Sequence, residues 1–189
     1  MKRLNIYSPN AISKAVKFLE SGQLVIYPTD TLYGLGADAK NSRAVEKISQ
    51  IKGRLGPWSI ATSDFTMLNK FCVIPKSHSE FVKEKLPGPI TIILPGKSQN
   101  LAPALLGPNK SVGVRIPDHL LTQKLIKRLG RPITSTSVNR TGKFPLNDPN
   151  KIIKTFFNEV DLILDAGILP TSLGSSIYNL SSDEIKKIR

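Results

Sequence analysis

The chain combines stretches whose apolar residues recur every three or four positions with short continuous apolar runs, and this pattern predicts its secondary structure. We expect helices where the first pattern lies between a capping residue and a glycine or polar stop. These stretches are residues 11–22, 43–53, 63–71, 79–86, 118–130 and 148–157. We expect strands where short apolar runs lie between turn residues. These runs are residues 24–28, 59–62, 86–96, 111–117, 132–137, 160–167, 174–180 and 185–189.

Helices and strands alternate irregularly in this series, which favours an α/β or α+β fold with mixed strand directions over a regular doubly wound fold. The length of 189 residues suits one domain, and a hydrophobic content of 40% is enough for a substantial core. No apolar stretch approaches the roughly 20 residues of a membrane span. No apolar segment of a secretory signal follows Lys2 and Arg3. We therefore expect a single domain over residues 1–189 that is cytoplasmic and does not enter a membrane.

The composition is strongly basic. Lysine and arginine outnumber acidic residues 27 to 14, and the net charge of +13 favours anionic partners such as nucleotides, phosphates or RNA. A lysine-rich surface in water is the alternative, because the lysines are spread along the chain and no RRM, KH or zinc-finger motif is present. Cys72 is the only cysteine, so no internal disulfide can form. Because His78 and His119 lie far apart in sequence, a Cys/His zinc site is not expected.

Familiar phosphate-binding and catalytic motifs are absent. The sequence PGKS at residues 95–98 matches the end of a P-loop, but Ile92 occupies the position where that motif requires a glycine. The sequence GLGADA lacks the third glycine of a dinucleotide fingerprint, and there is neither a nucleophile elbow nor an HExxH motif. Any phosphate site must therefore be built in another way.

Four polar clusters remain, each at the end of an apolar strand or helix. The first, YPTDTLYGLGADA at residues 27–39, follows a buried strand with the hydroxyls of Thr29, Thr31 and Tyr33 and with two glycines. Strand ends in open α/β sheets form ligand crevices, and glycine lets a ligand approach the backbone closely. The alternative is a turn rich in threonine and glycine that binds nothing.

The second and third clusters contribute cations. Lys52 and Arg54 end an amphipathic helix, where two cations could complement the helix dipole or together neutralise a polyphosphate. Arg115 lies inside a strand otherwise made of Val, Gly and Ile. A guanidinium buried there needs an anionic partner, because burying it unpaired costs several kcal/mol. That partner is either an internal aspartate or a ligand carboxylate.

The fourth cluster, PITSTSVNRTG at residues 132–142, follows an apolar strand with neutral polar side chains. Ser135, Ser137 and Asn139 alternate, so in an extended segment they point to the same side. Such a row suits phosphate oxygens or a sugar, and a polar surface turn is the alternative.

Together and in this order, the clusters resemble the YrdC/Sua5/TsaC family, the threonylcarbamoyl-AMP synthases of tRNA modification. The resemblance covers nearly the whole chain. It rests on YPTDTLYGLGADA, KGR, LPGPITIIL, SVGVRIPDH, ITSTSVNRTG and, more weakly, LGSSIYNL with Arg189. The usual family forms are PTDTxYGLG, KxRP, PGPxT, VRxPxH, TSANxSG and STV. The resemblance implies a YrdC-like α/β domain: a twisted, open mixed sheet with flanking helices around a deep, positively charged cavity. It points to the short single-domain branch, without a C-terminal Sua5 domain.

The resemblance also implies a reaction. Family members join L-threonine, bicarbonate and ATP into threonylcarbamoyl-adenylate and release pyrophosphate. A separate transferase complex then moves the threonylcarbamoyl group to A37 of tRNAs that read ANN codons. ATP would be a substrate, and Mg²⁺ would be held by the phosphates, since no carboxylate cluster suggests a protein metal site.

Individual roles follow from the same resemblance. Lys52 and Arg54 would be catalytic and would act at the α-phosphate and the leaving pyrophosphate. Apart from these two, the residues implied to contact ATP are Ser111, Ser137, Asn139, Arg189 and, through its backbone, Pro145. The residues implied to bind threonine are Thr29, Thr31, Ser135, Ser175 and, at the carboxylate, Arg115.

The loop after Arg54 departs from the family pattern. Leu55 replaces the usual proline, the loop is shorter than usual, and Trp58 stands where leucine is common. Two other functions stay open. The first is a non-catalytic module that binds double-stranded RNA or tRNA, which the net charge allows. The second is a carbamoyl-phosphate enzyme akin to the hydrogenase-maturation carbamoyltransferases. It is less favoured, because no acylphosphatase or zinc-finger segment is found.

Overall fold

A computed structural model describes residues 1–97, 101–182 and 184–189. The helices are α1 Ala11–Glu20, α2 Ser42–Lys52, α3 Phe65–Phe71, α4 Ser79–Lys85, α5 Leu120–Leu129 and α6 Pro149–Phe156. The strands are β1 Lys2–Asn5, β2 Val25–Tyr27, β3 Gly34–Gly36, β4 Ile60–Ala61, β5 Ile90–Pro95, β6 Ser111–Arg115, β7 Ile133–Thr134, β8 Thr136–Ser137, β9 Leu162–Asp165, β10 Ser176–Asn179 and β11 Lys186–Lys187. The helices and strands expected from the hydrophobic pattern are all present in these positions.

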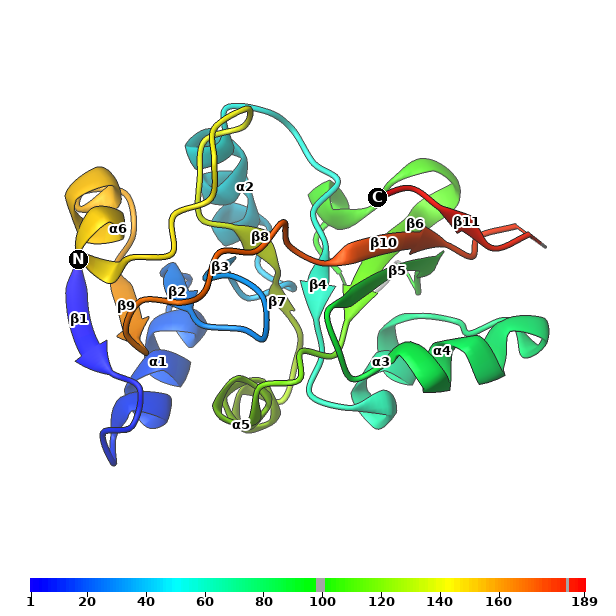
Figure 1. The fold of residues 1–189 in the computed structure, drawn as a ribbon, viewed down its shortest axis with the longest axis horizontal. Helices are drawn as coiled ribbons and strands as arrows, with labels where there is room; N and C mark the ends of the chain where they lie inside the picture. Colours follow the sequence, from blue (N-terminus) through cyan, green and yellow to red (C-terminus); the bar gives the residue numbers. More distant parts are fainter. Residues whose placement is uncertain (98–100, 183) are drawn as a thin grey trace.

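The strands form two β-sheets, each with mixed strand directions. One has the order β1-β9-β2-β3-β8 and the other β11-β10-β5-β6-β4-β7. Each sheet contains both parallel and antiparallel pairs. In the first sheet β2 pairs with β9 in parallel, and in the second β5 pairs with β6 in antiparallel orientation. An isolated antiparallel bridge between Asp38, which follows β3, and Ile133 of β7 links the two sheets. The predicted α/β fold with mixed strand direction is therefore confirmed, and the backbone hydrogen bonds divide it into two halves that lie next to each other (Figure 1).

The helix ends follow the capping residues of the sequence. Asn41 caps α2, where its side-chain oxygen accepts a hydrogen bond from the Ala44 amide at 3.1 Å. Gly53 ends α2 in the left-handed conformation, with φ of 68°. The cap of α5 is His119, whose Nδ1 accepts from the Thr122 amide at 3.3 Å. Asn41 and Gly53 thus fix the two ends of α2 and therefore where Lys52 lies.

Two strands were not expected from the hydrophobic pattern. Lys2–Asn5 pairs with β9 in parallel at the edge of its sheet. Because this edge strand is mostly exposed and polar, it has no apolar run to reveal it. Gly34–Gly36 forms the interior strand β3, which pairs with β2 and β8. A Cβ atom at Gly34 would lie 2.8 Å from the Tyr27 ring, so this glycine makes room for a core side chain.

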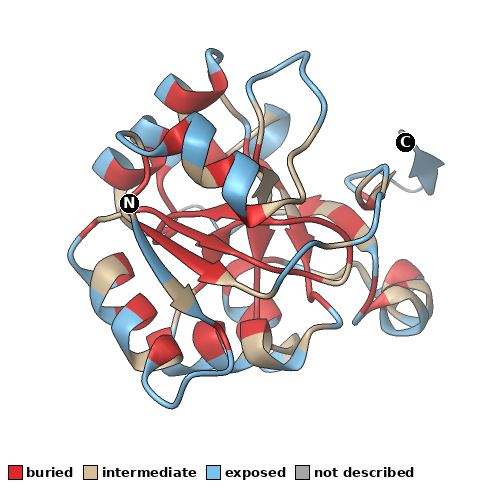
Figure 2. Cartoon of the chain, turned by 60° about the vertical axis from the view of Figure 1, so that its left-hand side comes forward, coloured by how far each residue is buried: buried red, intermediate tan, exposed pale blue. Residues whose placement is uncertain are grey.

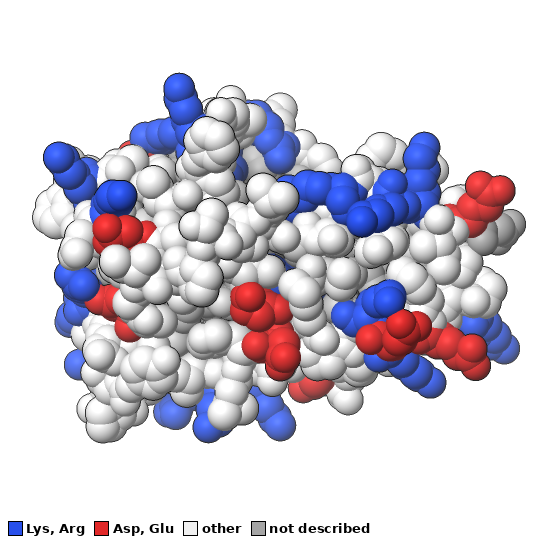
Figure 3. All heavy atoms as spheres, in the orientation of Figure 1, with Lys and Arg blue, Asp and Glu red and all other residues white. Residues whose placement is uncertain are grey.

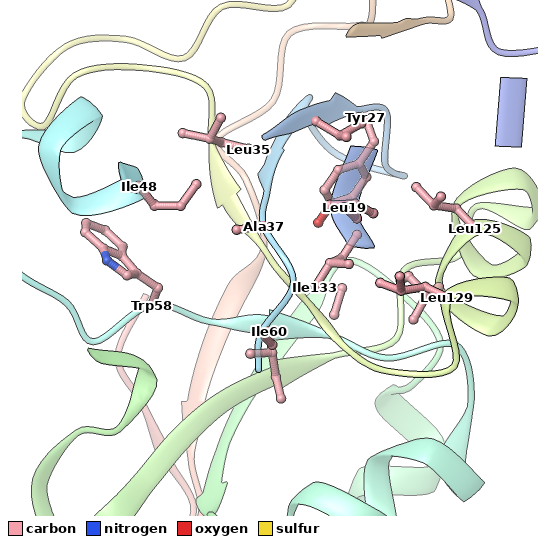
Figure 4. Packing of buried hydrophobic residues seen from close by; sticks show 14 of the residues in the cluster. Leu19, Tyr27, Leu35, Ala37, Ile48, Trp58, Ile60, Leu125, Leu129 and Ile133 are labelled. Atoms are coloured by element: carbon pink, nitrogen blue, oxygen red, sulfur yellow. The ribbon is translucent and has the colours of Figure 1, made fainter. Parts of the chain in front are cut away.

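The buried side chains lie between the sheets and their helices. Figure 2 shows that the strands are mostly buried, whereas the helices turn an exposed face outward. Figure 4 shows core residues drawn from several elements, including Leu19 of α1, Ile48 of α2 and Leu125 of α5. Trp58, which precedes β4, is 2% exposed and belongs to the same core. The loop that follows Arg54 is thus anchored in the core at its far end.

Candidate active site

The described part of the chain surrounds a cavity of about 590 Å³. Its wall comes from both sheets, namely from β3 and β8 of one and from β5, β6 and β10 of the other, together with the β2–β3 connection and the segment before β4. The residues singled out from the sequence that line it are Thr29, Thr31, Tyr33, Arg54, Ser111, Arg115, Ser135, Ser137, Pro145, Ser175 and Arg189. Four separate polar clusters of the sequence therefore meet in one hollow.

The charge of the wall is one-sided. Arg54, Arg115 and Arg189 line the cavity, and none of the wall residues in the described ranges is Asp or Glu. In the space-filling view a band of Lys and Arg side chains also surrounds the region of the C-terminus (Figures 1 and 3). Such a lining suits anionic ligands, although Asp30, which lies outside the lining, offsets the charge of Arg115.

Arg115 has a partner inside the protein. Its Nη2 donates to Asp30 Oδ1, and its Nη1 donates to Thr31 Oγ1 at 3.1 Å. Of the two kinds of partner considered from the sequence, the internal aspartate is therefore present. The pairing is incomplete, because Arg115 Nε and Asp30 Oδ2 are both buried and make no hydrogen bond in the described structure.

Thr29 uses its hydroxyl to shape the turn that carries Asp30. Its Oγ1 accepts hydrogen bonds from the amides of Thr31 and Leu32, each at 3.1 Å, and donates to the Leu32 carbonyl at 2.7 Å. This is the local side-chain bonding by which threonine stabilises turns. The turn holds Thr31 where its own hydroxyl meets Arg115.

Lys52 and Asn139 do not line the cavity themselves but lie directly behind Ser137, which does. Lys52 Nζ donates to Asn139 Oδ1 at 2.7 Å and to the carbonyl of Ser137 at 3.0 Å. The Ser137 hydroxyl, which belongs to the wall, donates to the same Asn139 oxygen at 2.6 Å. Burial, and secondarily the nearby charge of Arg54, lowers the pKa of Lys52 to about 8. Lys52 is thus close to Arg54 and held by neutral acceptors only.

Another part of the wall contains Ser175 and Arg189. Arg189 donates from Nε and Nη2 to the Ser175 carbonyl at 3.1 and 2.7 Å, and the Ser175 hydroxyl lies 2.7 Å from that of Thr91. Thr91, Trp58 and Asn179 also line the cavity, although no role for them follows from the sequence. A signal for Thr91 was available, because it is the one hydroxyl within the apolar run ITIIL.

No group of three or more His, Cys, Asp or Glu side chains that could hold a metal ion occurs within residues 1–97, 101–182 and 184–189. None of the helices in those ranges is long and apolar enough to cross a membrane.

Comparison with known proteins gives consistent matches. The sequence profile of the family Sua5_yciO_yrdC, described as "Telomere recombination", matches residues 17–189. The threonylcarbamoyl-AMP synthase of Pyrococcus abyssi is 34% identical over 88% of this chain and 50% of its own length. A putative threonylcarbamoyl-AMP synthase of Methanocaldococcus jannaschii is also 34% identical, over 100% of this chain and 92% of its own.

Solved structures agree with the sequence matches. The crystal structure of P. abyssi Sua5 complexed with L-threonine superposes with a TM-score of 0.89 and 31% identity, over 100% of this chain and 56% of that one. The chain spans about half the length of the curated relatives from P. abyssi and Bacillus subtilis.

Proposed function

The chain belongs to the Sua5–YciO–YrdC family, and from this membership we propose that it is a threonylcarbamoyl-AMP synthase. It would join L-threonine, bicarbonate and ATP into threonylcarbamoyl-AMP and release pyrophosphate, which makes it a nucleotidyltransferase. The observation that carries the proposal is the hollow lined by Arg54, Arg115 and Arg189 without a described acidic wall residue.

The charge of this hollow suits the reaction. A carboxylate, a carbamate and a triphosphate repel one another, and negative charge grows on the phosphates as pyrophosphate leaves. Fixed cations that face this charge stabilise the transition state. Arg54 would meet the leaving pyrophosphate, and Lys52, one layer behind, would act at the α-phosphate through its ammonium group or through Ser137. Much of the rate would come from positioning rather than from a covalent intermediate.

Threonine would bind in the deep part of the cavity. A guanidinium has five N–H donors, and the contacts with Thr31 and Asp30 use one on each terminal nitrogen of Arg115. Because Nε is buried, the threonine carboxylate would bind the N–H groups that remain on Nη1 and Nη2. The hydroxyls of Ser135, Ser175 and Thr91 supply neutral partners for its amino and hydroxyl groups. A site that hydrogen-bonds the substrate hydroxyl rejects valine strongly, whereas the extra methyl of threonine over serine is worth about 1–3 kcal/mol.

The nucleotide would lie along the outer part of the cavity. Ser111, Ser137, Pro145 and Arg189 line the cavity and would contact the nucleotide, Pro145 through its backbone, and Asn139 supports Ser137. Mg²⁺ would reach the site on the ATP phosphates, because oxygen-rich phosphates are its usual ligands. The product would pass to a threonylcarbamoyl transferase complex that modifies A37 of tRNA. Contact with tRNA is compatible with the basic band around the C-terminus (Figure 3).

A product assay tests the proposal. The chain is incubated with ATP, Mg²⁺ and labelled bicarbonate, together with threonine, with serine or with no amino acid. We expect pyrophosphate release and labelled adenylate that are highest with threonine and absent without an amino acid. A non-catalytic RNA module would instead give no threonine-dependent pyrophosphate and would bind tRNA with an affinity that falls steeply with salt. That result would overturn the proposal.

A further inference from the structure

Arg54 rests on the indole of Trp58. Its guanidinium carbon lies 4.0 Å from the centre of the Trp58 ring, and both residues line the cavity. Its Nη1 donates to the Leu55 carbonyl at 2.8 Å, and it forms no ion pair with the residues in the described ranges. The stacking contact with Trp58 is therefore the main side-chain contact that sets the direction of this guanidinium.

The indole itself is fixed. Trp58 is 2% exposed, and its Nε1 donates to Ser49 Oγ at 2.9 Å. Figure 4 shows the ring pointing toward Ile48, which, like Ser49, belongs to α2. Because α2 also ends at Lys52, one helix fixes both Lys52 and the surface on which Arg54 lies.

The loop between Arg54 and Trp58 offers little other support. Leu55 is 83% exposed, so its side chain does not hold the loop against the protein. At Gly56 the loop passes so close to the Ala104 carbonyl that a Cβ would lie 2.1 Å from that oxygen. This close passage fixes the backbone after Arg54, but it leaves the long Arg54 side chain to be held by the indole.

We propose that Trp58 is a positioning residue that presents Arg54 to the pyrophosphate portion of the nucleotide. An arginine side chain loses rotamer freedom when it binds, and a prior stack on a fixed ring removes much of that loss beforehand. The identity of the phosphate ligand rests on the proposed function, whereas the arrangement of Arg54 on Trp58 does not.

Binding of inorganic pyrophosphate with Mg²⁺ tests the proposal without any need for threonine. Calorimetry is carried out on the unmodified chain, Trp58→Leu, Trp58→Phe, Arg54→Ala and the double variant Arg54→Ala with Trp58→Leu. We expect Trp58→Leu to weaken binding by about tenfold and Trp58→Phe, which keeps a ring, by less than about threefold. In the Arg54→Ala background, Trp58→Leu should cause no further loss, because its effect passes through Arg54.

Fluorescence gives a second readout that a merely structural role would not produce. Trp58 is the only tryptophan of the chain, so its emission reports on this ring alone. We expect pyrophosphate to change the emission of the unmodified chain and to leave that of Arg54→Ala unchanged. If Trp58→Leu does not fold, Ser49→Ala takes its place, because it removes the hydrogen bond that anchors the ring. A loss of pyrophosphate affinity that occurs when Arg54 is present, and not in the Arg54→Ala background, then supports the inference.

Two results would overturn the inference. One is equal pyrophosphate affinity in Trp58→Leu and the unmodified chain. That result would overturn the role of Trp58 and would not contradict the proposed function. The other is a loss from Trp58→Leu that is as large in the Arg54→Ala background as in the unmodified one. If the unmodified chain does not bind pyrophosphate at all, this inference fails, and the product assay with threonine decides the proposed function separately.

Discussion

Lys52 Nζ lies 2.7 Å from the side-chain oxygen of Asn139, a residue 87 positions later in the chain. The same Asn139 oxygen accepts a hydrogen bond from Ser137, whose side chain faces the cavity. The end of helix α2 and the segment after β8 are thus joined at one polar point. Through these two hydrogen bonds, the position of Lys52 is coupled to that of Ser137 in the wall of the candidate active site.

Replacing Lys52 should abolish turnover and leave the fold intact. We expect Lys52→Ala to lower threonine-dependent pyrophosphate release by about a hundredfold or more, because a cation near the reacting phosphate is lost. Lys47→Ala is the matched control, since Lys47 lies on the same helix and donates to the Gly22 carbonyl at 3.1 Å, away from the cavity. Normal pyrophosphate release by Lys52→Ala would remove this residue from the mechanism.

Binding of ATP should weaken as the pH rises above about 8. Burial lowers the pKa of Lys52 to about 8 in the ligand-free protein, so its ammonium loses its proton, and its charge, above that pH. The neutral amine no longer attracts phosphate, and the ATP dissociation constant measured by calorimetry should increase over this range. Arg54→Gln removes the neighbouring charge that also lowers the pKa of Lys52, so the midpoint should move to higher pH. A dissociation constant that stays flat between pH 7 and 9.5 would contradict this assignment.

Arg115 should affect both threonine binding and stability. Arg115→Ala is expected to raise the threonine KM by about tenfold or more and the ATP KM by less than about twofold. It also leaves Asp30 buried without its cation, so the free energy of unfolding should fall by about 3 kcal/mol. Denaturant titration measures the second effect.

The control for Arg115 is Arg131→Ala, which breaks the ion pair between Arg131 and Asp38 outside the cavity. It should lower stability and leave the threonine KM unchanged. If Arg115→Ala and Arg131→Ala affect the threonine KM equally, Arg115 does not bind the carboxylate.

Gly34 should tolerate no larger residue while Tyr27 is present. The Tyr27 ring is fully buried and its hydroxyl donates to the Thr134 carbonyl at 2.9 Å, so it cannot easily move aside. An alanine Cβ at position 34 would lie 2.8 Å from that ring, and we expect Gly34→Ala to destabilise the fold by about 1–3 kcal/mol. In the double variant with Tyr27→Leu the loss should be smaller than the sum of the two single losses. Equal unfolding midpoints for Gly34→Ala and the unmodified chain would refute this steric account.

The helices, most of the strands and the segments that carry the candidate site can be predicted from the amino-acid sequence alone. Apolar periodicity, Asn41 as a cap and Gly53 as a stop act over a few residues, so they can be seen without coordinates. The order of the four polar clusters was also sufficient to indicate the family. Each of these features depends on local geometry or on motif order.

Which of these groups come into contact depends on the three-dimensional packing. It gave Arg115 an internal partner in Asp30, set Lys52 one layer behind the cavity, added Thr91 to the wall and stacked Arg54 on Trp58. It also showed that Gly34 makes room for Tyr27 inside the core. Pairs such as Arg115 with Asp30, 85 positions apart, form because two sheets bring distant strand ends to one place. A local pattern contains no information about that packing, since the side chain of Arg115 fits an internal carboxylate and a ligand carboxylate equally well.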